Sequence, residues 1–170
     1  MEIRTERLII RPWKDEDVKH YLAMSVDVGY NCFTPPGVYL VKDEAEALEK
    51  VRARMKNYSD FGIGKFPVFL KDSGEFIGTC GADKFELEGK TEYELGYRFM
   101  LNHWNKGYAT EAARAVLDYL LKDLKLPQVH AFAVYQNPGS LKVIEKVGFT
   151  YLRDFMWFNI IHRLYVKSYS

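Results

Sequence analysis

The chain has 170 residues, 48% of them apolar and 28% charged, which is the ordinary mixture of one globular domain spanning residues 1–170. Its 24 Lys and Arg residues nearly balance its 23 Asp and Glu residues, so it lacks the basic excess that nucleic-acid-binding domains show. No apolar run reaches the roughly 18 residues that span a bilayer, and the charged N-terminus lacks the apolar core of a secretory signal, so neither a membrane nor nucleic acid is an expected partner.

The cysteine content restricts the possible disulfides and metal sites. Cys32 and Cys80 allow at most one disulfide and have no metal-binding spacing. A reducing cytoplasm fits this usage best, and we expect no metal site.

The first third of the chain predicts one strand and two helices. Residues 6–13 begin as a β-rich run, and Asp15 opens a short helix. Residues 26–42 contain two Gly and two Pro and predict a loop. Asp43, followed three residues later by Glu46, is typical of a helix N-terminus and predicts a second, longer helix.

The middle of the chain predicts three strands, a helix and a fourth strand. Residues 66–70 and 75–80 flank a Lys-Asp-Ser-Gly turn, which favours a hairpin. Residues 93–101 alternate with a period of two, as a long strand does. Residues 107–124 form the clearest amphipathic helix, and residues 129–135 form a strand.

The remainder predicts a helix from Pro138 to Val147 and two closing strands within residues 149–166. The order is therefore β-α-α-β-β-β-α-β-α-β-β. This order indicates an α/β (α+β) protein with a mixed sheet and helices on its faces.

Two segments carry chemistry. The strand at 93–101 ends in a polar turn, and a long helix begins at Gly107, where free backbone N–H groups and the helix dipole suit a phosphate. Arg98 and Lys106 could add positive charge. Many α/β helices begin in this way with nothing bound, and the segment is neither a P-loop nor a Rossmann fingerprint.

The second segment is Asn137-Pro138-Gly139-Ser140. Asn137 is a good N-cap and Pro138 a good first helical residue, which explains the segment as local structure alone. The Asn137 amide could also reach a ligand.

Together, WNKGYATEA and NPGSLKVIEKVGF, about 30 residues apart, resemble the pyrophosphate loop and the second motif of the GNAT superfamily of N-acetyltransferases. TERLIIRPWKDED and EYELGYRFM resemble more narrowly the branch that acetylates protein N-termini, including those of ribosomal proteins. The resemblance covers Arg4 to Val166. It implies the acyl-CoA N-acyltransferase fold, a mostly antiparallel sheet of about six to seven strands flanked by about four helices, and acetyl-CoA as co-substrate.

The resemblance also implies how acetyl-CoA is held. The strand at 93–101 would splay from the strand at 129–135 and admit the pantetheine arm, and one backbone N–H would polarise the thioester carbonyl. The implied cofactor-binding residues are Phe99, Met100, Leu101, Asn105, Lys106, Gly107, Tyr108, Ala109, Thr110, Asn137 and Ser140.

The sequence departs from the family pattern at two positions. Trp104 stands where Gln or Arg is common, which costs little because the main chain binds the pyrophosphate. Ile144 stands where many members have a Tyr that protonates the leaving thiolate. We predict Ser140 in this role, with another Tyr or water as alternatives; a thiolate of pKa about 8.5 leaves without much help.

For the general base, Glu94 is the first candidate, acting directly or through water, and Glu92 and Asp83 are weaker ones. Glu94 could equally be an ordinary ion-paired carboxylate, with Arg98 as its partner. An α-amine, of pKa about 7.7–8.0, needs far less help than a lysine near 10.4.

The acceptor is less defined. Residues 72–94 hold seven acidic and two basic residues, which would attract a cationic acceptor or simply form a solvated hairpin. By analogy with the family, the loop at 26–42 flanks the acceptor. A peptide N-terminal α-amine is the leading hypothesis; a small amine (aminoglycoside, polyamine or amino-acid derivative) and a non-catalytic CoA-binding module are the alternatives. A monomer and a homodimer are both open.

Neither the histidines nor Cys80 is expected to be catalytic. The four histidines share no spacing, and Cys80 has no convincing base nearby, so a buried apolar role suits it better.

Overall fold

The computed structural model describes residues 1–169 and places their strands in one eight-stranded sheet of order β1-β2-β3-β4-β5-β6-β8-β7. All neighbouring strands are antiparallel except β5 and β6. The strands are β1 (Ile3–Arg4), β2 (Leu8–Ile10), β3 (Lys65–Leu70), β4 (Phe76–Leu87), β5 (Lys90–Phe99), β6 (Gln128–Val134), β7 (Thr150–Trp157) and β8 (Ile160–Ser168).

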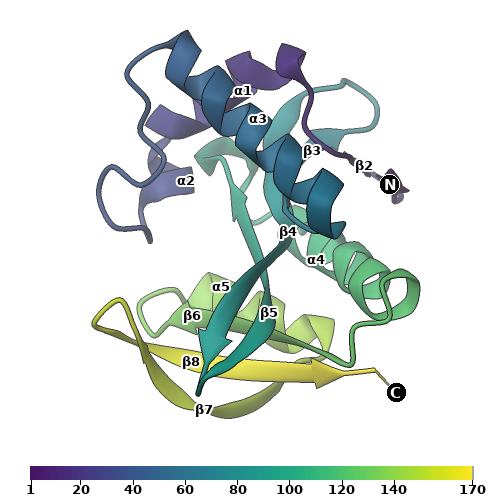
Figure 1. Cartoon of the computed structure of the whole chain (residues 1–170), viewed down its shortest axis with the longest axis vertical. Coiled ribbons are helices and arrows are strands. Elements are labelled where there is room, and N and C mark those ends of the chain that lie inside the picture. Colours follow the sequence, from purple (N-terminus) through teal and green to yellow (C-terminus); the bar gives the residue numbers. More distant parts are fainter. Residues whose placement is uncertain (170) are drawn as a thin grey trace.

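Five α-helices pack on the two faces of this sheet. They are α1 (Val18–Val26), α2 (Val28–Asn31), α3 (Glu44–Phe61), α4 (Tyr108–Asp118) and α5 (Pro138–Val147). In Figure 1, α1, α2 and α3 gather at the upper end, α5 lies with β6, β7 and β8 at the lower end, and the long β4 and β5 join the two ends. Within residues 1–169, every helix is too short or too polar to cross a bilayer.

Two apolar cores lie on opposite faces of the sheet. Alternation along β3 sends Val68 into the core beneath α4 and Phe69 into the core beneath α1 and α3. Ala112 and Val116 of α4 are fully buried in the first core, and Tyr21 of α1 and Val51 of α3 are buried in the second.

The helix boundaries follow the predicted signals. The Asp43 carboxylate accepts from the Glu46 amide at 2.8 Å and caps α3, which ends at Gly62 in the left-handed region. Asn137 accepts from the Ser140 amide at 3.0 Å and caps α5, which ends at Gly148. These caps confirm two of the predicted helices.

The predicted fold class is confirmed, with local differences. The sheet gains the two-residue β1, and the predicted loop at 26–42 contains the single-turn α2, capped by Asp27. The predicted helix at 107–124 is α4 followed by a π-helical turn over Tyr119–Asp123. The predicted strand at 93–101 ends at Phe99, because the chain turns into a short 3₁₀ helix at Leu101–His103.

One feature of the sheet positions the site. β4 and β5 pair over ten residues, whereas β5 and β6 pair only at Glu94 and His130. Beyond that point the two parallel strands diverge, so the sheet opens toward the C-terminal end of β5. The predicted splaying of these two strands is therefore present.

Candidate functional site

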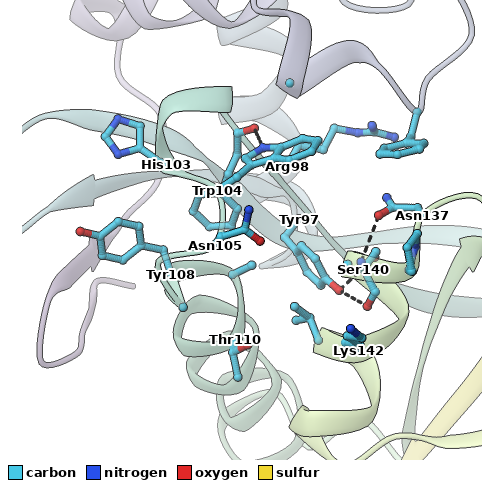
Figure 2. Close-up of a pocket in the computed structure, with 18 of the residues that line it drawn as sticks. Tyr97, Arg98, His103, Trp104, Asn105, Tyr108, Thr110, Asn137, Ser140 and Lys142 are labelled. Atoms are coloured by element: carbon cyan, nitrogen blue, oxygen red, sulfur yellow. Dashed lines mark hydrogen bonds between the residues drawn. The ribbon is translucent and has the colours of Figure 1, made fainter.

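A pocket of about 560 Å³ lies where β5 and β6 diverge. Its walls come from α2 and the loop after it, the end of β5, the turn into α4 and the start of α5. Eight of the eleven predicted cofactor-binding residues line it: Phe99, Asn105, Gly107, Tyr108, Ala109, Thr110, Asn137 and Ser140. Figure 2 shows the α4 and α5 residues approaching from separate helix ends.

Three predicted residues do not line this pocket: Met100, Leu101 and Lys106. The Met100 amide donates to the Ile77 carbonyl at 3.0 Å, and the Leu101 amide donates to the Asp27 carboxylate at 3.1 Å. These two N–H groups are used within the fold and are not free for a pantetheine arm.

The turn into α4 leaves its backbone amides free. Gly107 adopts φ +82°, Asn105 adopts φ +60°, and no side chain among residues 1–169 caps the helix. Within the described chain, no hydrogen bond uses the amides of residues 105–110 as donors. Free amides at a helix N-terminus, together with the helix dipole, bind phosphate groups, so this loop fits a pyrophosphate.

Trp104 closes this turn. Its indole N–H donates to the Phe99 carbonyl at 2.7 Å, and its ring stacks on Phe33 with a centroid distance of 6.5 Å. The residue that departs from the family pattern thus has a structural role and joins the turn to the loop after α2.

A contact between α4 and the N-terminal segment, which the sequence did not predict, stabilises this turn. Glu111 of α4 accepts hydrogen bonds from Thr5 Oγ1 at 2.6 Å and from the Arg7 amide at 2.9 Å, and it forms an ion pair with Arg7 Nε at 2.7 Å. Arg7 also donates to the Lys106 carbonyl at 3.0 Å. Burial alone would raise the pKa of Glu111, but the hydrogen bonds from Thr5 and Arg7 outweigh it and lower the pKa.

Substitution Glu111→Gln should lower the free energy of unfolding by about 1–3 kcal/mol, because donors on Thr5 and Arg7 lose a charged acceptor. A carboxyl whose pKa is lowered in the fold contributes stability above its unfolded pKa of about 4.3, and loses that contribution as the pH falls through the folded value. Urea denaturation should therefore show a larger difference in the free energy of unfolding between Glu111→Gln and wild type at pH 7 than at pH 3. Glu49→Gln, at an exposed position of α3, is the control. An equal difference at both pH values would contradict the assignment.

Across the pocket, a pair of hydroxyl groups joins β5 to the first turn of α5. The Tyr97 hydroxyl of β5 lies 3.0 Å from Ser140 Oγ and donates to the Ser140 carbonyl at 3.0 Å (Figure 2). Burial raises the pKa of Tyr97, so its hydroxyl stays protonated. Tyr97 is not among the predicted catalytic residues, although another Tyr remained an alternative proton donor; Ile144 itself is 2% exposed and belongs to the core.

Glu94 lies on the opposite face of β5 from Tyr97 and does not line the pocket. Its carboxylate pairs with Lys65 Nζ at 2.7 Å, and Asp83 lies 3.7 Å from the same ammonium. Burial alone would lower the pKa of Lys65, but Glu94 and Asp83 outweigh it and raise the pKa. The partner of Glu94 is therefore Lys65 and not Arg98.

The remaining acidic residues of 72–94 are largely partnered. Glu88 pairs with Arg153 at 2.7 Å, and Glu92 accepts from Gln128 at 3.0 Å. Glu75 lies 3.1 Å from His103. Burial raises the pKa of Cys80 to about 12, in agreement with the prediction of a buried, unreactive thiol.

Comparison with known proteins gives a consistent result. A family model described as an acetyltransferase (GNAT) domain matches residues 7–150. The uncharacterized protein YkkB of Bacillus subtilis is 31% identical over 98% of this chain and 95% of its own length, and the uncharacterized N-acetyltransferase YnaD of the same organism is 34% identical over 87% and 82%. The ribosomal-protein-S5-alanine acetyltransferase of Vibrio fischeri superposes with a TM-score of 0.80 at 16% identity, covering 100% of this chain and 97% of that one, and so shares its fold.

Proposed function

The chain belongs to the GNAT acetyltransferase family and is an N-acetyltransferase with acetyl-CoA as co-substrate; from this premise we propose that its acceptor is the α-amine of a peptide or protein N-terminus. The amine attacks the thioester carbonyl, the carbon–sulfur bond breaks, and an acetamide and coenzyme A result.

Different residues around the pocket would bind different parts of the co-substrate. The free amides of residues 105–110 would hold the pyrophosphate, with Gly107 giving the backbone its close approach. Asn137 and Ser140, at the start of α5, would contact the arm that carries the sulfur. Main-chain groups near Phe99 would orient the thioester.

The observation that carries a catalytic function is the Tyr97–Ser140 hydroxyl pair on the same pocket as these amides. If the Tyr97 proton turns from the Ser140 carbonyl to the leaving sulfur, it donates a hydrogen bond to the thiolate, which the apolar Ile144 cannot do. This pair supports an enzyme over a module that only binds coenzyme A.

Glu94 is the proposed base, acting through water because its carboxylate lies outside the pocket. The neighbouring Lys65 stays protonated because its pKa is raised. When Glu94 accepts a proton and loses its charge, Asp83 would remain as the carboxylate partner of the Lys65 ammonium. An acceptor that gives up its proton readily suits this arrangement. An α-amine, with a pKa of about 7.7–8.0, meets that requirement better than a lysine near 10.4.

An acceptor panel tests the proposal by thiol release from acetyl-CoA. The panel contains peptides with a free α-amine, the same peptides Nα-blocked with one free lysine, and small amines including spermidine. We expect turnover of the free α-amine peptides at pH 7 and little with the blocked ones. Turnover of spermidine or of the lysine peptides alone would contradict the α-amine proposal.

Substitution Tyr97→Phe should lower kcat about tenfold, a modest loss because a thiolate is already a fair leaving group. Ser140→Ala should do the same, and the double variant should be no slower than either single one, because the pair acts as a unit. The affinity for acetyl-CoA should stay within about twofold in Tyr97→Phe.

Because burial raises the pKa of Tyr97, the wild-type kcat should not fall through loss of this proton below about pH 10. Tyr93→Phe is the matched control: Tyr93 lies on the same face of β5, and no hydrogen bond in the described chain uses its hydroxyl. Equal losses in Tyr93→Phe and Tyr97→Phe would remove Tyr97 from the mechanism.

A further inference from the structure

Three cationic side chains meet on the face of the sheet that α1, α2 and α3 cover. Arg54 comes from α3, Lys65 from β3 and Arg98 from β5. The guanidinium carbons of Arg54 and Arg98 lie 6.0 Å and 5.6 Å from the centre of the Tyr39 ring, and Arg54 donates to the Lys65 carbonyl at 3.4 Å. We call these three residues the cationic cluster.

Among the described residues, the two guanidinium groups of the cluster have no anionic partner. Lys65 is satisfied by Glu94 and Asp83. Arg98 makes only long contacts to neutral oxygens, 3.5 Å to the Tyr30 carbonyl and 3.4 Å to Thr34 Oγ1. Within residues 1–169, no carboxylate lies within 4.0 Å of the guanidinium of Arg54 or Arg98.

This arrangement is unusual for a protein interior. A charge removed partly from water is normally paired, because desolvation otherwise disfavours it. A guanidinium has five N–H donors, and Arg98 uses its own only weakly. Its remaining donors can bind a further acceptor.

Arg98 also lines the pocket beside the 26–42 segment, which the family resemblance places next to the acceptor. It lines the pocket together with Tyr30 and Phe33, next to Tyr97 in the sequence and on the same face of β5 as Glu94. In Figure 2, Arg98 and Thr110 lie toward opposite ends of the drawn pocket. An anion beside Arg98 would therefore be separate from the pyrophosphate bound near Thr110.

We infer that the acceptor carries a carboxylate close to its reactive amine, and that Arg98 binds this carboxylate while Arg54 adds positive potential behind it. A guanidinium and a carboxylate form two parallel charge-assisted hydrogen bonds, which fix both position and orientation. The inference rests on the proposed function, since it concerns the same amine. The carboxylate comes either from an acidic side chain at the first or second position of a peptide, as the proposed function requires, or from the α-carboxylate of a free amino acid, which would keep the α-amine but replace the peptide as the acceptor.

Matched acceptor pairs test the inference. One set consists of peptides identical except for Asp or Asn at position one or two; the other consists of alanine and phenylalanine, each as free acid and as carboxamide. Because a neighbouring carboxylate also changes the pKa of the amine, kcat/KM is calculated per neutral amine. We expect wild type to prefer the carboxylate member of one set by about tenfold, and the set in which this occurs identifies the source.

Arg98→Gln should abolish the preference and leave the acetyl-CoA affinity unchanged, and Arg98→Lys should keep part of it. Arg52→Gln is the control, because Arg52 is an exposed arginine of α3 whose partner is Asp15. A preference that survives in Arg98→Gln, or its absence in wild type, overturns the inference.

A binding measurement separates this result from failure of the proposed function. Calorimetry with coenzyme A-saturated protein compares the N-acetylated Asp and Asn peptides and the N-acetylated amino acids with their amides. Tighter binding of the carboxylate members by wild type but not by Arg98→Gln supports the anion site even if no α-amine is acetylated, in which case only the proposed acceptor is wrong. Equal binding by both proteins overturns the anion site whatever the turnover.

Discussion

Substitution Gly107→Val is expected to raise the dissociation constant for acetyl-CoA by about 100-fold. Gly107 adopts φ +82°, which costs a β-branched residue on the order of 1–3 kcal/mol, and an added Cβ would lie 3.3 Å from the Arg7 guanidinium. Arg7 holds the Lys106 carbonyl and Glu111, so both effects move the turn that presents the free amides. A loss of about 2.7 kcal/mol corresponds to 100-fold in affinity.

The control for this substitution is Gly89→Val in the β4–β5 hairpin. Gly89 has a similar φ of +76°, and a Cβ there would meet nothing within 4 Å. Gly89→Val should therefore lose stability through the same backbone strain and keep its affinity for acetyl-CoA, as measured by calorimetry on the folded protein. Full affinity in Gly107→Val would remove the pyrophosphate assignment.

The sequence predicts most of the fold because its signals are local. The Asp43–Glu46 cap, the turn before β4 and the period of α4 each lie within a few residues, and each element forms where it is expected. The helix α2 was missed for the opposite reason. Its stability depends on Asp27, whose carboxylate joins the Tyr30 amide to the Leu101 amide, 74 residues away in the sequence.

The candidate site also combines local features, which the sequence predicts, with contacts between distant residues, which it does not. The free amides of residues 105–110 belong to one contiguous motif and could be predicted. The contact between Tyr97 and Ser140 spans 43 residues, that between Lys65 and Glu94 spans 29, and that between Thr5 and Glu111 spans 106. Each depends on strand register and on how helices pack on the sheet, which periodicity alone does not determine.

The Lys65–Glu94 pair changes the interpretation of the acidic stretch at 72–94. Two carboxylates of this stretch, Glu94 and Asp83, pair with Lys65, and within residues 1–169 the guanidinium groups of Arg54 and Arg98 on the same face of the sheet have no carboxylate partner. The composition of the segment favours a cationic acceptor, whereas the local arrangement favours an acceptor with an anionic group beside its amine. The net charge of residues 72–94 is therefore negative, whereas the unpaired charges of the cationic cluster are positive.

Substitution Glu94→Gln is expected to lower kcat about 100-fold at pH 7, the usual contribution of a general base, with little change in acetyl-CoA affinity. Glutamine keeps an oxygen that can accept from Lys65, so the packing around the ammonium is preserved while the proton acceptor is lost. Glu92 lies two residues earlier on the same face and accepts a hydrogen bond from Gln128. The control variant Glu92→Gln should therefore retain most of the activity. Thiol release with a free α-amine peptide measures both variants.

The pH dependence distinguishes a base from a structural residue. An α-amine of pKa about 7.7–8.0 is largely neutral at pH 9, where the base has less to do, so the deficit of Glu94→Gln should shrink between pH 7 and pH 9. A purely structural loss from the disturbed Lys65 pair would give the same deficit at both values. A deficit that is constant with pH, or unchanged turnover, would therefore transfer the role from Glu94 to water or to Asp83.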